Sequence, residues 1–209
     1  MNRLFYIFVC MFFVCIFTQA QTSTRDSHDK QFRNRIAIPL KNGDNAADIN
    51  GDGKDDCIFV ARRENYNAHG YSQYSFYIHY KDTDAEQPLW YLVTFEDKDH
   101  SRYDNLTTVE GADGNIQDIR VLRSDSPSDS SLTVIIGRRE MGQSYADSGK
   151  VSFTVYQLCR NQEGVPGWPP FYFQESRTIF GKMKHVDINE AFSSELGISG
   201  DSTNVSNEK

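Results

Sequence analysis

Residues 48–60 read Asp-Ile-Asn-Gly-Asp-Gly-Lys-Asp-Asp-Cys-Ile-Phe-Val, an acidic, glycine-containing loop that leads into an apolar run. Gly51 and Gly53 allow the positive φ angles that a sharp turn needs. Oxygen atoms at alternate positions of such a turn face one centre, which suits a hard cation such as Ca2+. The candidate ligands are the side chains of Asp48, Asn50, Asp52 and Asp56 and the main-chain carbonyl of Lys54.

This loop differs from an EF-hand, which needs a Glu at its twelfth position, because Phe59 stands there. The apolar run that begins at Cys57 is typical of a β-strand, so the ligands would lie at the mouth of a strand. The sequence therefore predicts a bound Ca2+ or another hard divalent cation. The alternative is an acidic turn in which Asp and Asn side chains accept hydrogen bonds from their own backbone.

Short apolar segments on both sides of the loop predict β-strands, because their hydrophobic residues recur with a period near two. In residues 151–159, for example, odd-numbered side chains face one side and even-numbered side chains the other. Such short strands, joined by turn-forming residues, indicate an all-β fold, either an antiparallel β-sandwich or a barrel. The predicted strands are 35–40, 57–60, 72–80, 89–95, 116–122, 132–136, 151–159 and 171–180.

The C-terminal part of the chain has a different pattern. In residues 187–196, apolar side chains recur at helical spacing, and Asp187 or Asn189 is placed to cap the helix. We expect a β domain with its terminal helix over residues 35–197, a polar lead-in at 21–34 and a flexible tail at 198–209.

Residues 1–20 predict a cleaved secretory signal peptide. Arg3 supplies the positive start, 4–17 is apolar, and Ala20 is the small residue before the cleavage site. A retained membrane anchor is the alternative, although the run is short for a span of about 20 residues. Without this segment, 189 residues remain with a net charge of −8, since the segment carries one basic and no acidic residue. That charge argues against nucleic acid as a partner.

Cys57 and Cys159 remain after signal cleavage. Two cysteines in an exported chain predict one disulfide. The alternative is two buried free thiols.

The usual catalytic sets are missing from the sequence. Ser27 and Lys30 match the Ser-x-x-Lys pattern of serine β-lactamases, but the companion Ser-Asp-Asn and Lys-Thr-Gly motifs are absent. The five histidines are scattered and do not pair at a zinc-ligand spacing. There is no Gly-x-Ser-x-Gly elbow. We therefore expect a protein that is not an enzyme.

The order of these parts resembles the carbapenem intrinsic resistance family of CarG-like proteins. The resemblance lies in the signal peptide, the acidic loop 48–59, the segments 111–113 and 118–122, and the strand 153–158. It implies a periplasmic homodimer with a β-sandwich fold, short terminal α-helices and a bound cation held by the loop residues named above. It also implies protection of the producing cell from carbapenem without known hydrolysis, through the drug itself or a periplasmic protein target.

The fold of that family is similar to that of inhibitors of invertebrate lysozyme, which use a Ser-Gly motif with a nearby Tyr. Ser148-Gly149 matches the motif, but no Tyr follows closely. A periplasmic inhibitor of invertebrate-type lysozyme is therefore the alternative function.

Overall fold

The computed structural model describes residues 32, 34–66, 69–82, 86–125, 132–162, 164 and 168–200. The chain divides into two units, residues 1–34 and residues 35–209. Only Phe32 and Asn34 of the first unit are described, so the predicted signal peptide and nearly all of the lead-in lie outside the described residues, as does 201–209. No helix in the described ranges is long and apolar enough to cross a membrane.

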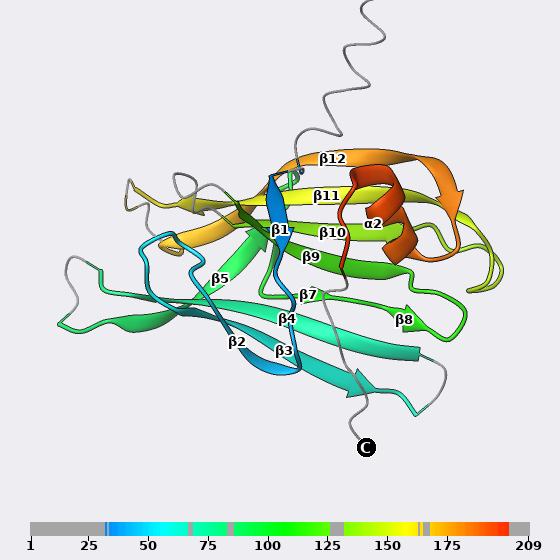
Figure 1. Ribbon diagram of the computed structural model, residues 1–209. Helices are drawn as coiled ribbons and strands as arrows, with labels where there is room; N and C mark the ends of the chain where they lie inside the picture. The colour runs from blue at the N-terminus through cyan, green and yellow to red at the C-terminus, as the bar shows by residue number, and fades with distance from the viewer. Residues whose placement is uncertain are drawn as a thin grey trace, which may run out of the picture. The chain divides into compact units, whose positions relative to one another are not determined.

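Twelve strands of the second unit form a hydrogen-bonded sheet within the described residues (Figure 1). One helix, α2 (Ile188–Leu196), follows them. The strands are β1 (Arg35–Ala37), β2 (Gly43–Ala47), β3 (Asp56–Glu64), β4 (His69–Tyr80), β5 (Leu89–Glu96), β6 (Arg102–Tyr103), β7 (Leu106–Thr107), β8 (Glu110–Gly111), β9 (Gln117–Ser124), β10 (Thr133–Arg139), β11 (Gly149–Arg160) and β12 (Phe171–His185).

All eight predicted strands are confirmed, although their bounds shift by a few residues. The sequence did not predict β2 or the three two-residue strands β6, β7 and β8. The residues of β2, Gly-Asp-Asn-Ala-Ala, show no apolar alternation. They form a strand because they pair with β3 over their whole length, from Gly43 opposite Val60 to Ala47 opposite Asp56.

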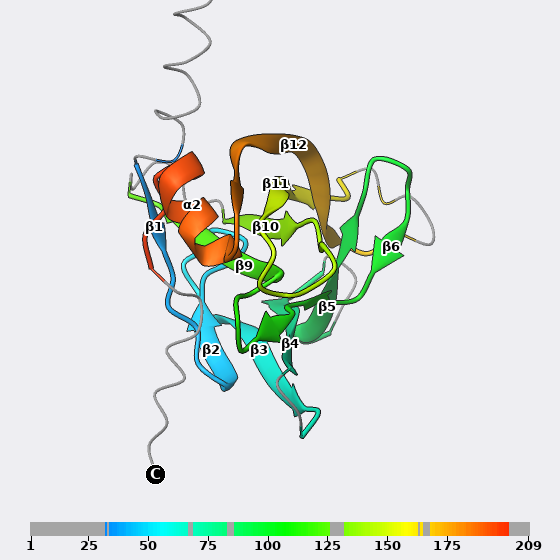
Figure 2. The same cartoon turned by 90° about the vertical axis from the view of Figure 1, so that its right-hand side faces the viewer.

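The strands follow the order β1-β9-β10-β11-β12-β5-β4-β3-β2 across the sheet. Neighbours along this order are antiparallel except β12 and β5, which run parallel with Tyr172 opposite Thr94. Strands β9–β12 lie above β2–β4, and β5 connects the two tiers (Figures 1 and 2). The all-β prediction is confirmed. The β-sandwich is not confirmed, because the β5–β12 pairing joins both halves into one curled open sheet.

Aromatic side chains fill the core that the curled sheet encloses. Phe95 stacks on Phe173 with ring centroids 4.9 Å apart, and Phe76 meets these two rings edge-on at 5.4 and 5.3 Å. Tyr156 approaches Phe95 edge-on at 5.2 Å. Such pairs add about 0.5–1.5 kcal/mol each beyond the burial of area. Because these rings come from β4, β5, β11 and β12, the core lies across the parallel junction.

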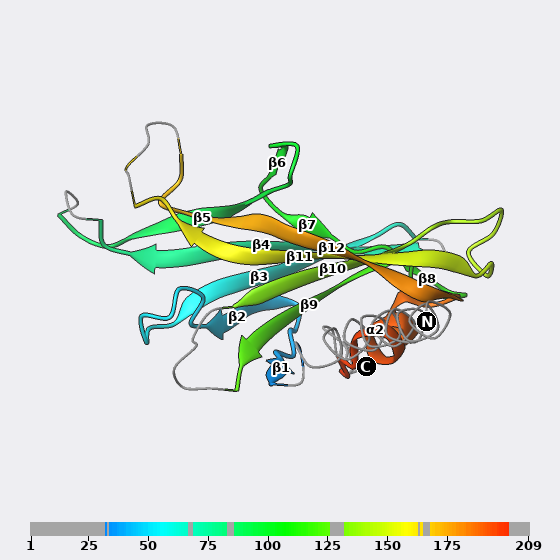
Figure 3. The same ribbon diagram turned by 90° about the horizontal axis from the view of Figure 1, so that it is seen from above.

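Helix α2 packs against β9, β10 and β12 at one side of the sheet (Figure 3). Phe153 of β11 and Phe192 of α2 lie with ring centroids 5.1 Å apart. A Cβ atom at Gly137 would lie 2.8 Å from the Phe192 ring, so glycine at this position allows the helix to approach the sheet. Val155 pairs with Arg177 and the next residue, Tyr156, pairs with Glu175, so β12 has a bulge at Ser176.

The predicted C-terminal helix is confirmed, and its cap is the expected Asp187, whose side chain accepts a hydrogen bond from the Asn189 N–H at 2.7 Å. Gly197 ends the helix in the left-handed region with φ of 67°. The apolar side chains that predicted the helix are all buried, namely Ile188, Ala191, Phe192 and Leu196.

The predicted disulfide between Cys57 and Cys159 is wrong, because both residues are free thiols. Cys57 lies on β3 and Cys159 on β11. In the sheet order β12, β5 and β4 stand between these strands. A disulfide needs Cα atoms about 4.4–6.8 Å apart, and strands that are direct neighbours already lie about 4.8 Å apart. Along the sheet, the three intervening strands therefore keep Cys57 and Cys159 beyond this distance.

Candidate functional site in the acidic loop and its adjoining pocket

The acidic loop, residues 48–55, is the connection of the β2–β3 hairpin. The two strands pair up to Ala47 opposite Asp56, so the loop begins and ends at adjacent points of the sheet. Gly51 and Gly53 have φ angles of 78° and 79°, as the sequence predicts for a sharp turn.

The Asp48 carboxylate organises the turn. Its Oδ1 accepts hydrogen bonds from the N–H groups of Gly51 at 2.7 Å and Asp52 at 3.1 Å, and its Oδ2 accepts one from Gly53 at 2.9 Å. One side chain thereby satisfies three backbone donors. This backbone bonding is the arrangement that the sequence allowed as the alternative to a cation site.

Asn50 and Asp52 continue the same pattern toward the tip of the loop. The Asn50 side-chain oxygen accepts from the Asp52 N–H at 2.9 Å, and Asp52 Oδ1 accepts from the Lys54 N–H at 2.9 Å. The Lys54 ammonium group lies 3.8 Å from Asp52 Oδ2. Because the Lys54 side chain is 71% exposed, this ion pair contributes little to stability.

Asp56 differs from the other acids of the loop because it is only 2% exposed. Its two oxygens accept hydrogen bonds from the N–H groups of Ile49 and His79, each at 2.9 Å. Burial raises the pKa of this carboxyl, and the hydrogen bonds from the backbone of His79, Ile49 and Asn50 oppose the rise. Asp56 therefore ties the loop to β4.

The loop offers oxygen ligands of the type that a hard cation prefers. A carboxylate or amide oxygen that accepts one N–H group keeps a lone pair for a second partner. Among the described residues, no three His, Cys, Asp or Glu side chains are arranged to hold a metal ion. By chemistry, the residues that fit a cation are Asp48, Asn50, Asp52 and the Lys54 carbonyl. Asp56 is set apart from them by its burial, since it is 2% exposed and its oxygens face the N–H groups of Ile49 and His79.

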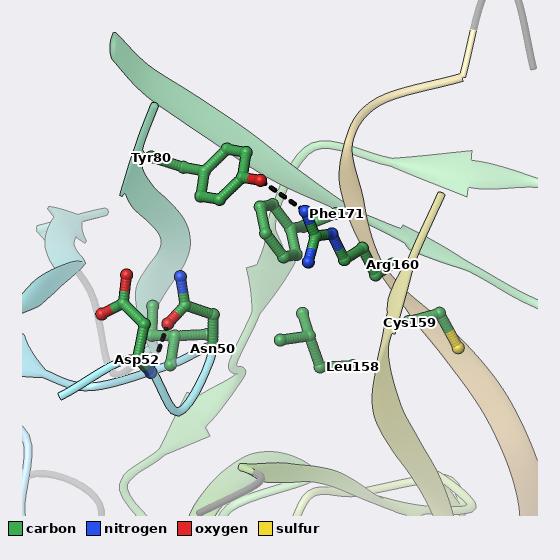
Figure 4. Close-up of a pocket in the computed structure, with 8 residues that line it drawn as sticks. Asn50, Asp52, Tyr80, Leu158, Cys159, Arg160 and Phe171 are labelled. Atoms are coloured by element: carbon green, nitrogen blue, oxygen red, sulfur yellow. Dashed lines mark hydrogen bonds between the residues drawn. The ribbon is translucent and has the colours of Figure 1, made fainter. Parts of the chain in front are cut away.

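A pocket of about 260 Å³ lies beside the tip of the loop (Figure 4). Asn50 and Asp52 form one side of it. Residues from the end of β4, the end of β11 and the start of β12 form the rest. The complete lining consists of Ile49, Asn50, Asp52, Tyr80, Leu158, Cys159, Arg160 and Phe171.

Arg160 brings a positive charge to this pocket. Its guanidinium carbon lies 5.2 Å from the centroid of the Tyr80 ring and 5.8 Å from that of Phe171. Its Nη2 donates a hydrogen bond to the Tyr80 hydroxyl (Figure 4). Tyr80 and Phe171 in turn pack edge-on with ring centroids 5.1 Å apart. The two rings and the hydroxyl thus orient the guanidinium in the pocket.

Strand alternation at the end of β11 decides which side chains face the pocket. Leu158 and Arg160 lie on the pocket side, whereas the Cys159 sulfur points away from it (Figure 4). The Cys159 sulfur instead lies 3.8 Å from Oε1 of Gln174. Burial raises the pKa of the Cys159 thiol, which disfavours the thiolate that a reactive cysteine needs.

The sequence located the loop but not the pocket. Tyr80 ends β4 and lies 80 residues before Arg160, which ends β11, whereas Phe171 begins the next strand, β12. Only the pairing of Arg160 with Phe171 in the β11–β12 ladder and the curl of the sheet bring them together. The sequence did contain one signal of the pocket: the alternation of the strand places Arg160 on the same side as Leu158.

Comparison with known proteins shows which family the chain belongs to. Residues 40–194 match the family described as "Carbapenem resistance protein CarG-like". The chain belongs to this family. The matched range runs from just before β2 to within α2, so it contains the acidic loop, the pocket and nearly all of the curled sheet.

A solved structure described as "Crystal structure of CarG" supports the same fold. It aligns with a TM-score of 0.60 at 24% sequence identity, over 79% of this chain and 99% of that chain. No curated protein sequence gives a significant match. At this identity the solved structure establishes the architecture, and the family match establishes the relationship.

Proposed function

We propose that this protein is exported and protects a cell from carbapenem antibiotics without hydrolysing them. The observation that carries the proposal is the match of residues 40–194 to the CarG-like carbapenem resistance family. The groups that face the pocket supply positive charge, hydrogen bonds and apolar surface, which are means of binding. The proposal also includes the periplasm as the place of action and a homodimer as the assembly.

Export is the feature of this proposal that a cell-based assay tests first. Expression of the full chain in a carbapenem-sensitive host should raise the minimum inhibitory concentration of a carbapenem above that of the vector alone. A chain without residues 2–20 should give no protection, because it would stay on the wrong side of the membrane. Immunoblots of fractionated cells serve as the control for amount and location. Full sensitivity of cells that contain the exported form would contradict the proposal.

We propose further that the acidic loop binds Ca2+ through Asp48, Asn50, Asp52 and the Lys54 carbonyl. Such an ion would hold the turn in place. Ligand at about 100 times its Kd stabilises a folded protein by about 2.7 kcal/mol. For a domain of this size, that corresponds to an increase in Tm of about 5–10 °C.

Melting curves with Ca2+ and with excess chelator test this proposal. Ca2+ should raise the Tm of the unmodified protein, and Asp52→Ala should remove the response. Asp55→Ala is the matched control, because Asp55 is an exposed acid of the same loop outside the proposed ligand set. Identical curves in Ca2+ and in chelator would count against the cation.

Inhibition of invertebrate-type lysozyme is the alternative function, and its motif has a structural explanation here. Gly149 begins β11, where a Cβ atom would lie 2.0 Å from the carbonyl oxygen of Glu140. Packing of the strand therefore requires a glycine after Ser148 whatever the protein binds. Loss of lytic activity when invertebrate-type lysozyme is incubated with the purified protein would favour the alternative.

A further inference from the structure

We propose that the pocket beside the acidic loop binds a small amphipathic carboxylate, with the carboxylate against Arg160. The inference rests on the proposed function for the identity of the ligand, because a carbapenem is a compact bicyclic molecule with one carboxylate. It adds a mechanism to that function: the protein would protect by direct recognition of the ligand.

The positive end of the pocket is oriented before any ligand arrives. Arg160 lies beside the paired Tyr80 and Phe171 rings and donates to the Tyr80 hydroxyl. Among the described residues, no carboxylate forms an ion pair with this guanidinium, whereas Arg62, Arg102 and Arg120 each have at least one. A guanidinium offers five N–H donors in a planar fork that matches a carboxylate. Arg160 is thus available for an anion from outside the chain.

The middle of the pocket is apolar. Leu158 and the ring of Phe171 line it on the β11–β12 side, and Ile49 lines it on the loop side. Phe171 is 5% exposed and Ile49 is fully buried, so these walls are fixed by the core behind them. A ligand with a hydrocarbon frame would cover the apolar surface of the partly exposed Leu158 and Tyr80, at about 25 cal/mol for each Å² removed from water.

The end opposite Arg160 is polar and acidic. Asn50 and Asp52 line it, and their side chains lie across the pocket from the guanidinium (Figure 4). In the loop without a bound cation, this acidic end repels a carboxylate and favours a hydroxyl, amide or ammonium group. The pocket therefore sets a direction for the ligand, with its anion at Arg160 and a hydrogen-bond donor at the loop. The volume of about 260 Å³ is slightly below the range of about 300–1,000 Å³ of drug-sized ligand sites, so the pocket suits a small ligand.

Two sources supply this chemistry, a carbapenem and the C-terminal carboxylate of a short peptide. Isothermal titration calorimetry on the protein purified from the exported fraction separates them. The probes are meropenem, N-acetyl-alanyl-alanine and the amide of the same dipeptide, which lacks the carboxylate. Wild-type protein should bind meropenem or the free dipeptide acid, and the amide should bind at least about tenfold more weakly than the acid.

Arg160→Gln should weaken binding by about tenfold or more, because it removes a charge-assisted hydrogen bond. Arg63→Gln is the matched control, since Arg63 lies over the Tyr71 ring at 4.7 Å and does not line the pocket. Melting curves check that both variants fold. Equal affinity of Arg160→Gln and wild type, or no binding of either carboxylate at millimolar concentration, would overturn the inference.

The inference and the proposed function fail in different experiments. Exported protein that protects cells but binds neither carboxylate would end the inference and leave the proposed function standing. Protein that binds through Arg160 but gives no protection would support the pocket and end the proposed function.

Discussion

Replacement of Arg120 by methionine should lower the free energy of unfolding by about 3–5 kcal/mol, because it breaks a buried ion pair from one side. Arg120 is 2% exposed, and its Nη1 lies 2.7 Å from Oδ2 of Asp118. Its Nη2 donates to the side-chain oxygen of Asn189 in α2 at 2.6 Å, and the guanidinium lies over the Phe192 ring at 4.5 Å. The variant would leave the Asp118 carboxylate buried without this partner and would weaken the docking of the helix.

Chemical denaturation of the two proteins measures this effect. Arg123→Met is the matched control, because Arg123 lies on the same strand and is exposed, and its replacement should change stability by less than about 0.5 kcal/mol. A loss below about 1 kcal/mol for Arg120→Met would show that the helix does not depend on this residue.

The second large effect should come from Asp56→Ala, with a loss of about 2–4 kcal/mol. The variant removes the acceptor of two backbone N–H groups, those of Ile49 and His79. A buried donor without a partner costs about 1–3 kcal/mol, and the His79 donor is only partly buried, so it costs less. Because Ile49 lines the pocket, we also expect weaker binding of any ligand there.

Denaturation of Asp56→Ala beside Asp55→Ala checks this prediction. Asp55 is the neighbouring exposed acid, so its loss should be nearly neutral. Similar stability of the two variants would mean that the loop does not need the buried carboxylate, and it would leave the hydrogen bonds to Asp48 as the main support of the turn.

Local pattern predicted the terminal helix and eight of the twelve strands in the described residues, because each of these elements is visible in the spacing of its own apolar residues. Alternation within 151–159 and the spacing of Ile188, Ala191, Phe192 and Leu196 are examples. The curl of the sheet could not be predicted in this way. It depends on the parallel pairing of Tyr172 with Thr94, two residues from distant parts of the chain.

In the candidate site, too, local features were predictable and contacts between distant strands were not. The acidic loop and its glycines were visible in the sequence, and so was the possibility that Asp48 bonds its own backbone. The pocket was not, because Tyr80 and Arg160 meet only after the sheet has formed. The disulfide was predicted wrongly for a related reason. Two cysteines in apolar runs do not reveal that Cys57 and Cys159 lie on strands that the sheet keeps apart.

We propose that the protein recognises a carbapenem without hydrolysing it, and recovery of the drug after contact with the protein tests this proposal. Meropenem is incubated with excess purified protein, the mixture is denatured, and the drug is measured by mass spectrometry. We expect full recovery of the drug at its original mass, together with depletion of free drug by the wild type before denaturation. Accumulation of a product heavier by one water molecule, at a rate that depends on the protein, would contradict it.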